Sequence, residues 1–342
     1  MSVQALTWLH GVIMICTHPI SHSLERLVTL TEQLLDTEIT IKRLKETPYR
    51  GMLLDPYTYD TGDTYILVST AYLGMLKDFV IARHCMTLLL KGSAFHTGNL
   101  KILSYNEESV YRGMKQIYLD ILKEDSECGR KIETPQLLRI LFQLYSHFYE
   151  TCAEVPWDII VNRWLYQHCP KMRKAQMYYL IKEGKRDMAA LLQFKDSLPK
   201  KFFVMNKAMF YARDLYLADV LPSYDLMPVK NIPQMQKFEH LGVKEMLTTR
   251  WTRSSWYKTK VVGDRMKQIL EENVLSDNEN LKDTAYFTGI FNQGVAVTDL
   301  WCSYMHMENW FTWAPPEVHR VTDGRKEEIE ASALRRIFGD LI

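Results

Sequence analysis

The spacing of apolar residues constrains the fold more than any other feature, because they recur every three or four positions over much of the chain. This spacing places them on one face of a helix. Over 21–46 the pattern is carried by Leu24, Leu27, Val28, Leu34, Leu35, Ile41 and Leu44. It predicts a helix there, and its prevalence predicts a mainly α fold: an irregular, two-lobed helical bundle with little or no β structure.

Prolines and turn residues divide the remaining chain into further elements. We expect helices over 64–91, 106–125, 135–153, 199–221, 264–273, 283–308 and 325–338. Between residues 153 and 199 we expect shorter helices, which end at Pro156, Pro170 and Gly184. A β-branched and aromatic stretch at 248–262 could be extended. Pro222, Pro228 and Pro233 predict a linker over 221–234, between an N-terminal lobe at 1–220 and a C-terminal lobe at 235–342.

Motifs for the common enzyme chemistries are absent from the sequence. It has no Gly-rich phosphate loop, no G-x-S-x-G and no H-E-x-x-H. Pro19 interrupts the helix that a zinc pair of His18 and His22 would need. We therefore expect a protein that is not an enzyme and has no cofactor, metal or small-molecule substrate. An unfamiliar active site stays open, including a thiol–imidazole pair from Cys152, His168 and Cys169, although buried structural cysteines are favoured.

Cysteine usage and hydropathy bear on the compartment. The six cysteines form no C-x-x-C pair, which favours reduced thiols in the cytoplasm or nucleus. The longest apolar stretch, 65–90, contains Lys77, Asp78, Arg83 and His84, each costly inside a bilayer. We expect an intracellular protein without a membrane span.

The distribution of charge is more informative than the net charge of +1. Residues 163–207 contain eleven bases and three acids, a balance of +8. Residues 244–267 contain seven bases and two acids, a balance of +5, whereas residues 271–308 contain seven acids and one base. Positive charge is thus concentrated in the middle of the chain. In the segment 250–260 the cations alternate with aromatics, a composition suited to holding phosphates while bases stack. The alternative is a set of ordinary solvated faces with core tryptophans.

Aromatic residues are also dense near the C-terminus. Trp310, Phe311 and Trp313 precede Pro315-Pro316. Such residues are enriched at interfaces, so they are candidate contacts between subunits. Packing within their own domain is the alternative.

The apolar segment 3–15, ahead of a proline, could be an arm that docks on a neighbouring subunit or simply the first core helix. A helical chain with two lobes, a basic middle and arm-like ends resembles the nucleoproteins of negative-strand RNA viruses in its organisation. This resemblance implies a viral structural protein, found in the virion, that sheathes single-stranded RNA in a basic groove and contacts copies of itself or other viral structural proteins. By this resemblance the expected RNA-binding residues are Lys171, Arg173, Lys174, Lys185, Arg186, Lys200, Lys201, Arg250, Trp251, Arg253, Trp256, Tyr257, Lys258 and Lys260. A helical capsid or clamp subunit without an RNA groove is the alternative.

Overall fold

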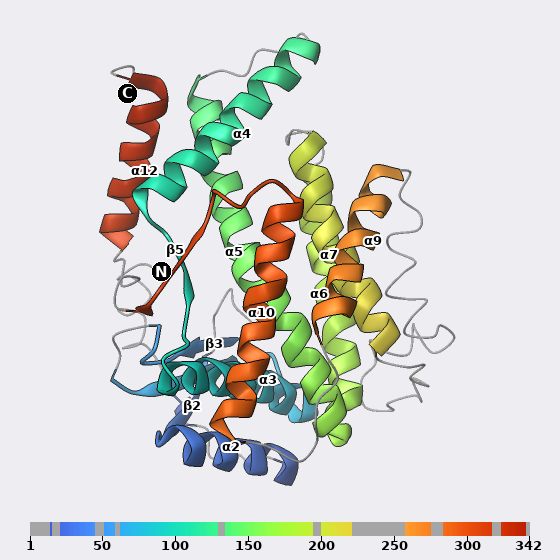
Figure 1. Ribbon diagram of the computed structural model, residues 1–342. Helices are drawn as coiled ribbons and strands as arrows, with labels where there is room; N and C mark the ends of the chain where they lie inside the picture. Colours follow the sequence, from blue (N-terminus) through green and yellow to red (C-terminus); the bar gives the residue numbers. More distant parts are fainter. Residues whose placement is uncertain are drawn as a thin grey trace.

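The computed structural model describes residues 14–15, 21–44, 51–58, 62–128, 134–193, 200–220, 257–274, 283–316 and 323–339. Within these ranges the chain forms nine α-helices and only a few short strands (Figure 1). The predicted mainly α class is therefore confirmed.

The helices form a bundle with helices across its two ends. Their bounds are α2 (His22–Leu35), α3 (Gly74–His96), α4 (Glu107–Cys128), α5 (Thr134–His168), α6 (Arg173–Gln193), α7 (Lys200–Val220), α9 (Tyr257–Asn273), α10 (Thr284–Tyr304) and α12 (Asp323–Phe338), with a 3₁₀ turn, η2, at Pro170–Met172. In Figure 1 α5, α6, α7, α9 and α10 run roughly along one direction, with α2 and α3 across one end and α4 and α12 at the other.

A small mixed sheet lies in the first 70 residues, where the sequence predicts two helices joined by a loop. Its strands are β1 (Met14–Ile15), β2 (Ile39–Leu44), β3 (Gly51–Leu54) and β4 (Thr64–Ser69), in the order β1-β2-β4-β3. β2 and β4 are parallel, with Ile41 opposite Ile66, whereas the outer pairs are antiparallel. A separate two-stranded sheet joins β5 (Ile102–Ser104) to β6 (Thr312–Ala314).

The predicted helix over 21–46 is too long, because α2 ends at Leu35. Asp36 adopts a left-handed conformation with φ of 48°, and its N–H donates to the carbonyl of Glu32. This geometry closes a helix, and the β-branched residues that follow favour a strand. The predicted helix over 64–91 is also wrong at its start, because Thr64–Ser69 forms β4 and α3 begins only at Gly74.

Two expected helix breaks do not occur. α5 continues through Pro156 to His168, and α6 continues through Gly184 to Gln193. α5 packs against α3, α4, α6, α7 and α10, so tertiary contacts outweigh the hydrogen bond that Pro156 cannot donate. In the segment expected to be possibly extended, residues 257–262 are helical as the start of α9.

The described helices share one hydrophobic core. It includes Leu141 and Phe148 of α5, Met209 of α7, Leu270 of α9 and Trp301 of α10. The Trp157 ring of α5 stacks on Phe291 of α10 with centroids 4.6 Å apart. Helices from both sides of the expected linker thus contribute to the same core, while 221–234 itself lies outside the described residues.

Candidate nucleic-acid interface

Part of the positive charge of the central basic stretch lies on one exposed face of α6 and of the turn before it. Lys174, Lys182 and Arg186 are exposed on this helix, and Lys171 is exposed in η2 just before it. Tyr178 lies between Lys174 and Lys182 at the same four-residue spacing and is half-buried. Because residues four apart lie on one side of a helix, these side chains form a continuous ridge. We call the four cations the α6 basic face.

The acids of α6 point away from this face. Its sequence contains only two, Glu183 and Asp187. Glu183 is 5% exposed, and Asp187 forms an ion pair with Arg213 of α7, with Oδ2 2.8 Å from Nη1. Positive charge on the outward side is therefore not neutralised by carboxylates from the same helix.

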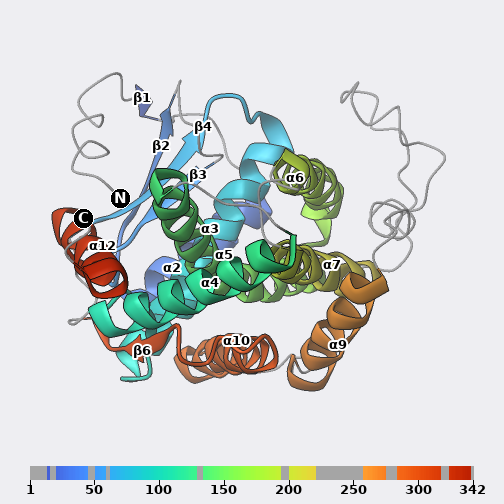
Figure 2. The same cartoon turned by 90° about the horizontal axis from the view of Figure 1, so that it is seen from above.

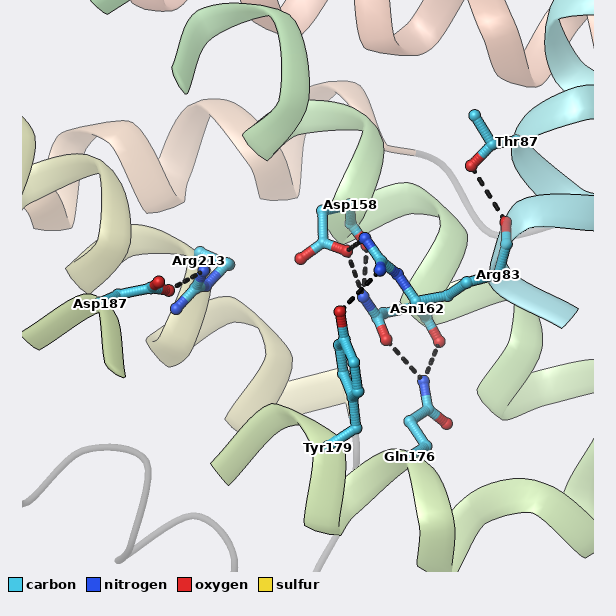
Figure 3. Close-up of polar contacts among 8 residues, drawn as sticks. All are labelled: Arg83, Thr87, Asp158, Asn162, Gln176, Tyr179, Asp187 and Arg213. Carbon is cyan, nitrogen blue, oxygen red and sulfur yellow. Dashed lines mark hydrogen bonds and ion pairs between the residues drawn. The ribbon is translucent and has the colours of Figure 1, made fainter. Parts of the chain in front are cut away.

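A network of polar side chains fixes α6 to its neighbours from beneath (Figure 3). The Tyr179 hydroxyl accepts a hydrogen bond of 2.7 Å from Arg83 Nη1 of α3. Arg83 Nη2 also donates to Asp158 of α5 over 2.6 Å. The Gln176 amide donates to the backbone carbonyl of Asn162 on α5 over 2.6 Å. Together with the Asp187–Arg213 pair, these bonds tie α6 to α3, α5 and α7 and so set the direction of its outward face.

The carboxylates of this network stabilise the charged forms of its two arginines. Burial disfavours the charged form of Arg83, but Asp158 and Tyr179 outweigh it and raise the pKa of the guanidinium. The pKa of Arg213 is likewise raised, because Asp214 and Asp187 outweigh its burial. Both arginines are therefore fixed cations paired inside the protein, and their role is to hold helices together.

Two of the expected RNA-binding cations have partners within the protein. Arg173 donates from Nε to the carbonyl of Tyr166 over 2.7 Å, and its guanidinium lies 4.4 Å from the centre of the Tyr166 ring. Lys201 forms an ion pair with Asp120 of α4, with Nζ 2.7 Å from Oδ2. Both residues contribute to packing near η2 and at the start of α7, and neither belongs to the α6 basic face.

The remaining expected residues are only partly covered by the described chain. Lys185, Lys200, Tyr257, Lys258 and Lys260 are placed by their backbone in α6, α7 and α9. α7 lies between α6 and α9, so Lys258 and Lys260 are on a helix that is not adjacent to the α6 basic face (Figure 2). Arg250, Trp251, Arg253 and Trp256 lie outside the described residues.

The C-terminal aromatic residues pack mainly within the chain. Trp310 is 3% and Phe311 7% exposed, and the Trp310 ring meets the edge of Phe148 with centroids 5.8 Å apart. The half-buried Trp313 donates from Nε1 to Asp299 over 2.6 Å. The structure does not support the prediction that Trp310 and Phe311 contact other subunits, because both side chains are buried within this chain.

The possible thiol–imidazole pair of Cys152 and His168 is excluded by helix geometry. Both residues lie on the continuous α5, sixteen residues or about 24 Å apart. Cys152 instead contacts Cys302 of α10, with the two sulfurs 3.9 Å apart. The hydrogen bond with Cys152 and burial raise the pKa of Cys302, which disfavours the thiolate form of that side chain.

Sequence reasoning missed Lys182 and Tyr178 as members of the ridge. The signal was the four-residue spacing of Lys174, Tyr178, Lys182 and Arg186. The prediction that Gly184 ends a helix separated Arg186 from the other three residues of this series.

Two other features, a metal site and a membrane-spanning helix, were sought in the described ranges. Over these residues no group of three His, Cys, Asp or Glu side chains is arranged to hold a metal ion. No described helix combines the length and apolarity that crossing a membrane requires.

Comparison with known proteins gives no assignment of family. The chain matches no protein-family model, no curated protein and no solved structure.

Proposed function

We propose that this protein binds single-stranded RNA without reading its sequence, and that the α6 basic face contacts the phosphates. The observation that carries the proposal is the separation of charge on α6, where exposed cations face outward and both acids face inward. Binding a phosphate backbone requires cations that are free to exchange their small counterions for phosphates. Within the described parts of the chain, Lys171, Lys174, Lys182 and Arg186 are exposed and form no ion pair with a carboxylate.

The length of the ridge sets how much of a strand one copy could contact. From Lys174 to Arg186 it spans twelve residues, about 18 Å, which matches on the order of five stacked nucleotides. One copy would therefore cover a short stretch of a long strand. In its full form the proposal is a non-enzymatic structural protein that coats RNA in many copies, as the resemblance to viral nucleoproteins implies.

The direct test is whether the purified protein carries nucleic acid that salt releases. The test variant combines Lys174→Gln, Lys182→Gln and Arg186→Gln. We expect the wild type to show a raised ratio of absorbance at 260 nm to 280 nm at low salt, lost after nuclease treatment or at high salt. The α6 variant should carry much less nucleic acid, because three phosphate contacts are removed.

A matched variant on α4 controls for net charge. Arg112→Gln, Lys115→Gln and Lys123→Gln remove three exposed cations from another helix. This variant should retain nucleic acid like the wild type. Equal retention by the α6 variant, or protein free of nucleic acid in every case, would contradict the proposal.

A further inference from the structure

Two bulky apolar side chains project into solvent where β4 is joined to α3. Leu73, the last residue before the helix, is 69% exposed, and Met75 in the first turn of α3 is 49% exposed. No other exposed large apolar residue in the described ranges reaches these values. We call these two side chains the apolar tip. Because they lie together, they form a candidate contact surface, unlike isolated exposed residues.

The backbone on either side of Leu73 fixes the shape of the apolar tip. Arg43 of β2 donates from Nη2 to the carbonyls of Thr70 and Tyr72, over 2.9 and 3.1 Å. Gly74 then turns the chain with a φ of 54°, which glycine adopts without strain. Because Leu73 lies between these two constraints, its backbone loses little conformational freedom when the tip makes a contact.

The α6 basic face adjoins the apolar tip, because α3 and α6 pack side by side (Figure 2). The Lys182 ammonium lies 5.1 Å from the centre of the Tyr72 ring, and Tyr72 immediately precedes Leu73. Arg186 is exposed one turn further along α6. The first turn of α3 contains no acid, and Asp78 further along that helix is only 7% exposed. Exposed apolar side chains and cations therefore share one surface.

We propose that this combined surface binds an anionic lipid bilayer, with Leu73 and Met75 inserted among the headgroups and the α6 basic face held against their negative charges. This inference goes beyond the proposed function and does not depend on RNA binding. Cations are attracted to anionic headgroups, and apolar side chains leave water at the boundary of headgroups and acyl chains. RNA would satisfy the cations but offers no apolar layer for the tip, whereas an anionic bilayer satisfies both.

The test measures cosedimentation of the protein with lipid vesicles. The vesicles contain phosphatidylcholine alone or mixed with phosphatidylserine. We expect the wild type to bind only the anionic vesicles, and to bind them more weakly at high salt. The tip variant, Leu73→Ser with Met75→Ser, leaves every charge in place. It should bind about 10-fold more weakly, because the tip no longer inserts. Soluble glycerophosphoserine should not compete, since it has no apolar layer.

Two further variants separate the contributions of charge and apolar surface. Leu119→Ser with Leu300→Ser is the matched control, because it removes two exposed leucines from other helices, α4 and α10, and should bind like the wild type. The triple α6 variant described above should lose binding to anionic vesicles. Equal binding by the tip variant and the wild type, or no binding of the wild type to anionic vesicles, overturns the inference. Failure to bind RNA in a parallel assay overturns only the proposed function.

Two measurements cover the remaining outcomes. Sedimentation velocity compares the association state of the tip variant with that of the wild type. A smaller assembly with unchanged vesicle binding would show that a second copy covers the tip, and it overturns the inference. If the tip variant loses its helical circular dichroism, Leu73→Trp replaces it. Because tryptophan favours the membrane interface, this variant should bind anionic vesicles at least as tightly as the wild type, and weaker binding overturns the inference.

Discussion

Asp158 of α5 links two of the polar side chains beneath α6. It accepts hydrogen bonds from Arg83 of α3 over 2.6 Å and from Asn162 of its own helix over 2.9 Å. Arg83 in turn reaches Tyr179 of α6. The side chains of Arg83 and Asp158 are only 23% and 17% exposed, so water does little to screen their attraction. Asp158 therefore helps to hold α6 through Arg83, although its own hydrogen bonds are to α3 and α5.

We predict that Asp158→Asn lowers the free energy of unfolding by about 2 to 3 kcal/mol, because it leaves the Arg83 charge partly buried without its carboxylate. Urea unfolding followed by circular dichroism measures this change. Glu271→Gln is the control, since it removes a more exposed ion pair with Lys267 on α9 and should cost less than about 0.5 kcal/mol. Equal losses for the two variants would show that the Arg83–Asp158 pair has no special role.

At the scale of elements, sequence periodicity located most helices but could not identify the strands. The expected helix over 283–308 corresponds to α10, where the Asp283 side chain accepts the N–H of Tyr286 as an N-cap. Such caps are local and can be recognised in a sequence. The strand β2, by contrast, depends on a distant partner. It pairs with β4, which follows β3 in the sequence. A non-local partner leaves little signal in the segment 39–44 itself.

The same limit applies to the candidate interface. The excess of basic residues over 163–207 predicted a positive surface, and Lys171, Lys174 and Arg186 are indeed exposed. Which cations become paired could not be predicted, because the partner of Lys201 is Asp120, on a different helix. Only the packing of α4 and α7 brings these two residues together.

The end of α2 provides a test of the transition from helix to strand. Asp36 has a φ of 48°, a region that glycine adopts without strain and β-branched residues avoid. We expect Asp36→Gly to change stability by less than about 1 kcal/mol, and Asp36→Val to destabilise by about 1 to 2 kcal/mol. Thermal unfolding of the two variants measures the difference. Equal melting temperatures would contradict a left-handed residue at this position.

At the scale of the whole molecule, nearly balanced charges coexist with a local concentration of cations. The net charge is only +1, so the overall field offers little attraction to RNA. Within the described residues, the bonds beneath α6 turn its acids inward and leave its cations exposed. The one hydrophobic core keeps α6 in place relative to the other described helices. Binding is therefore expected to depend on one face and to be sensitive to salt.

The salt dependence of affinity for a synthetic single-stranded RNA tests the central claim most directly. The logarithm of the binding constant is plotted against the logarithm of salt concentration for the wild type, the α6 triple variant and the α4 triple variant. Each phosphate contact on a single strand contributes about 0.7 to the slope, so the α6 variant should have a slope about 2 units shallower than the wild type. The α4 variant should keep the wild-type slope. Parallel lines for the wild type and the α6 variant would contradict phosphate binding by this face.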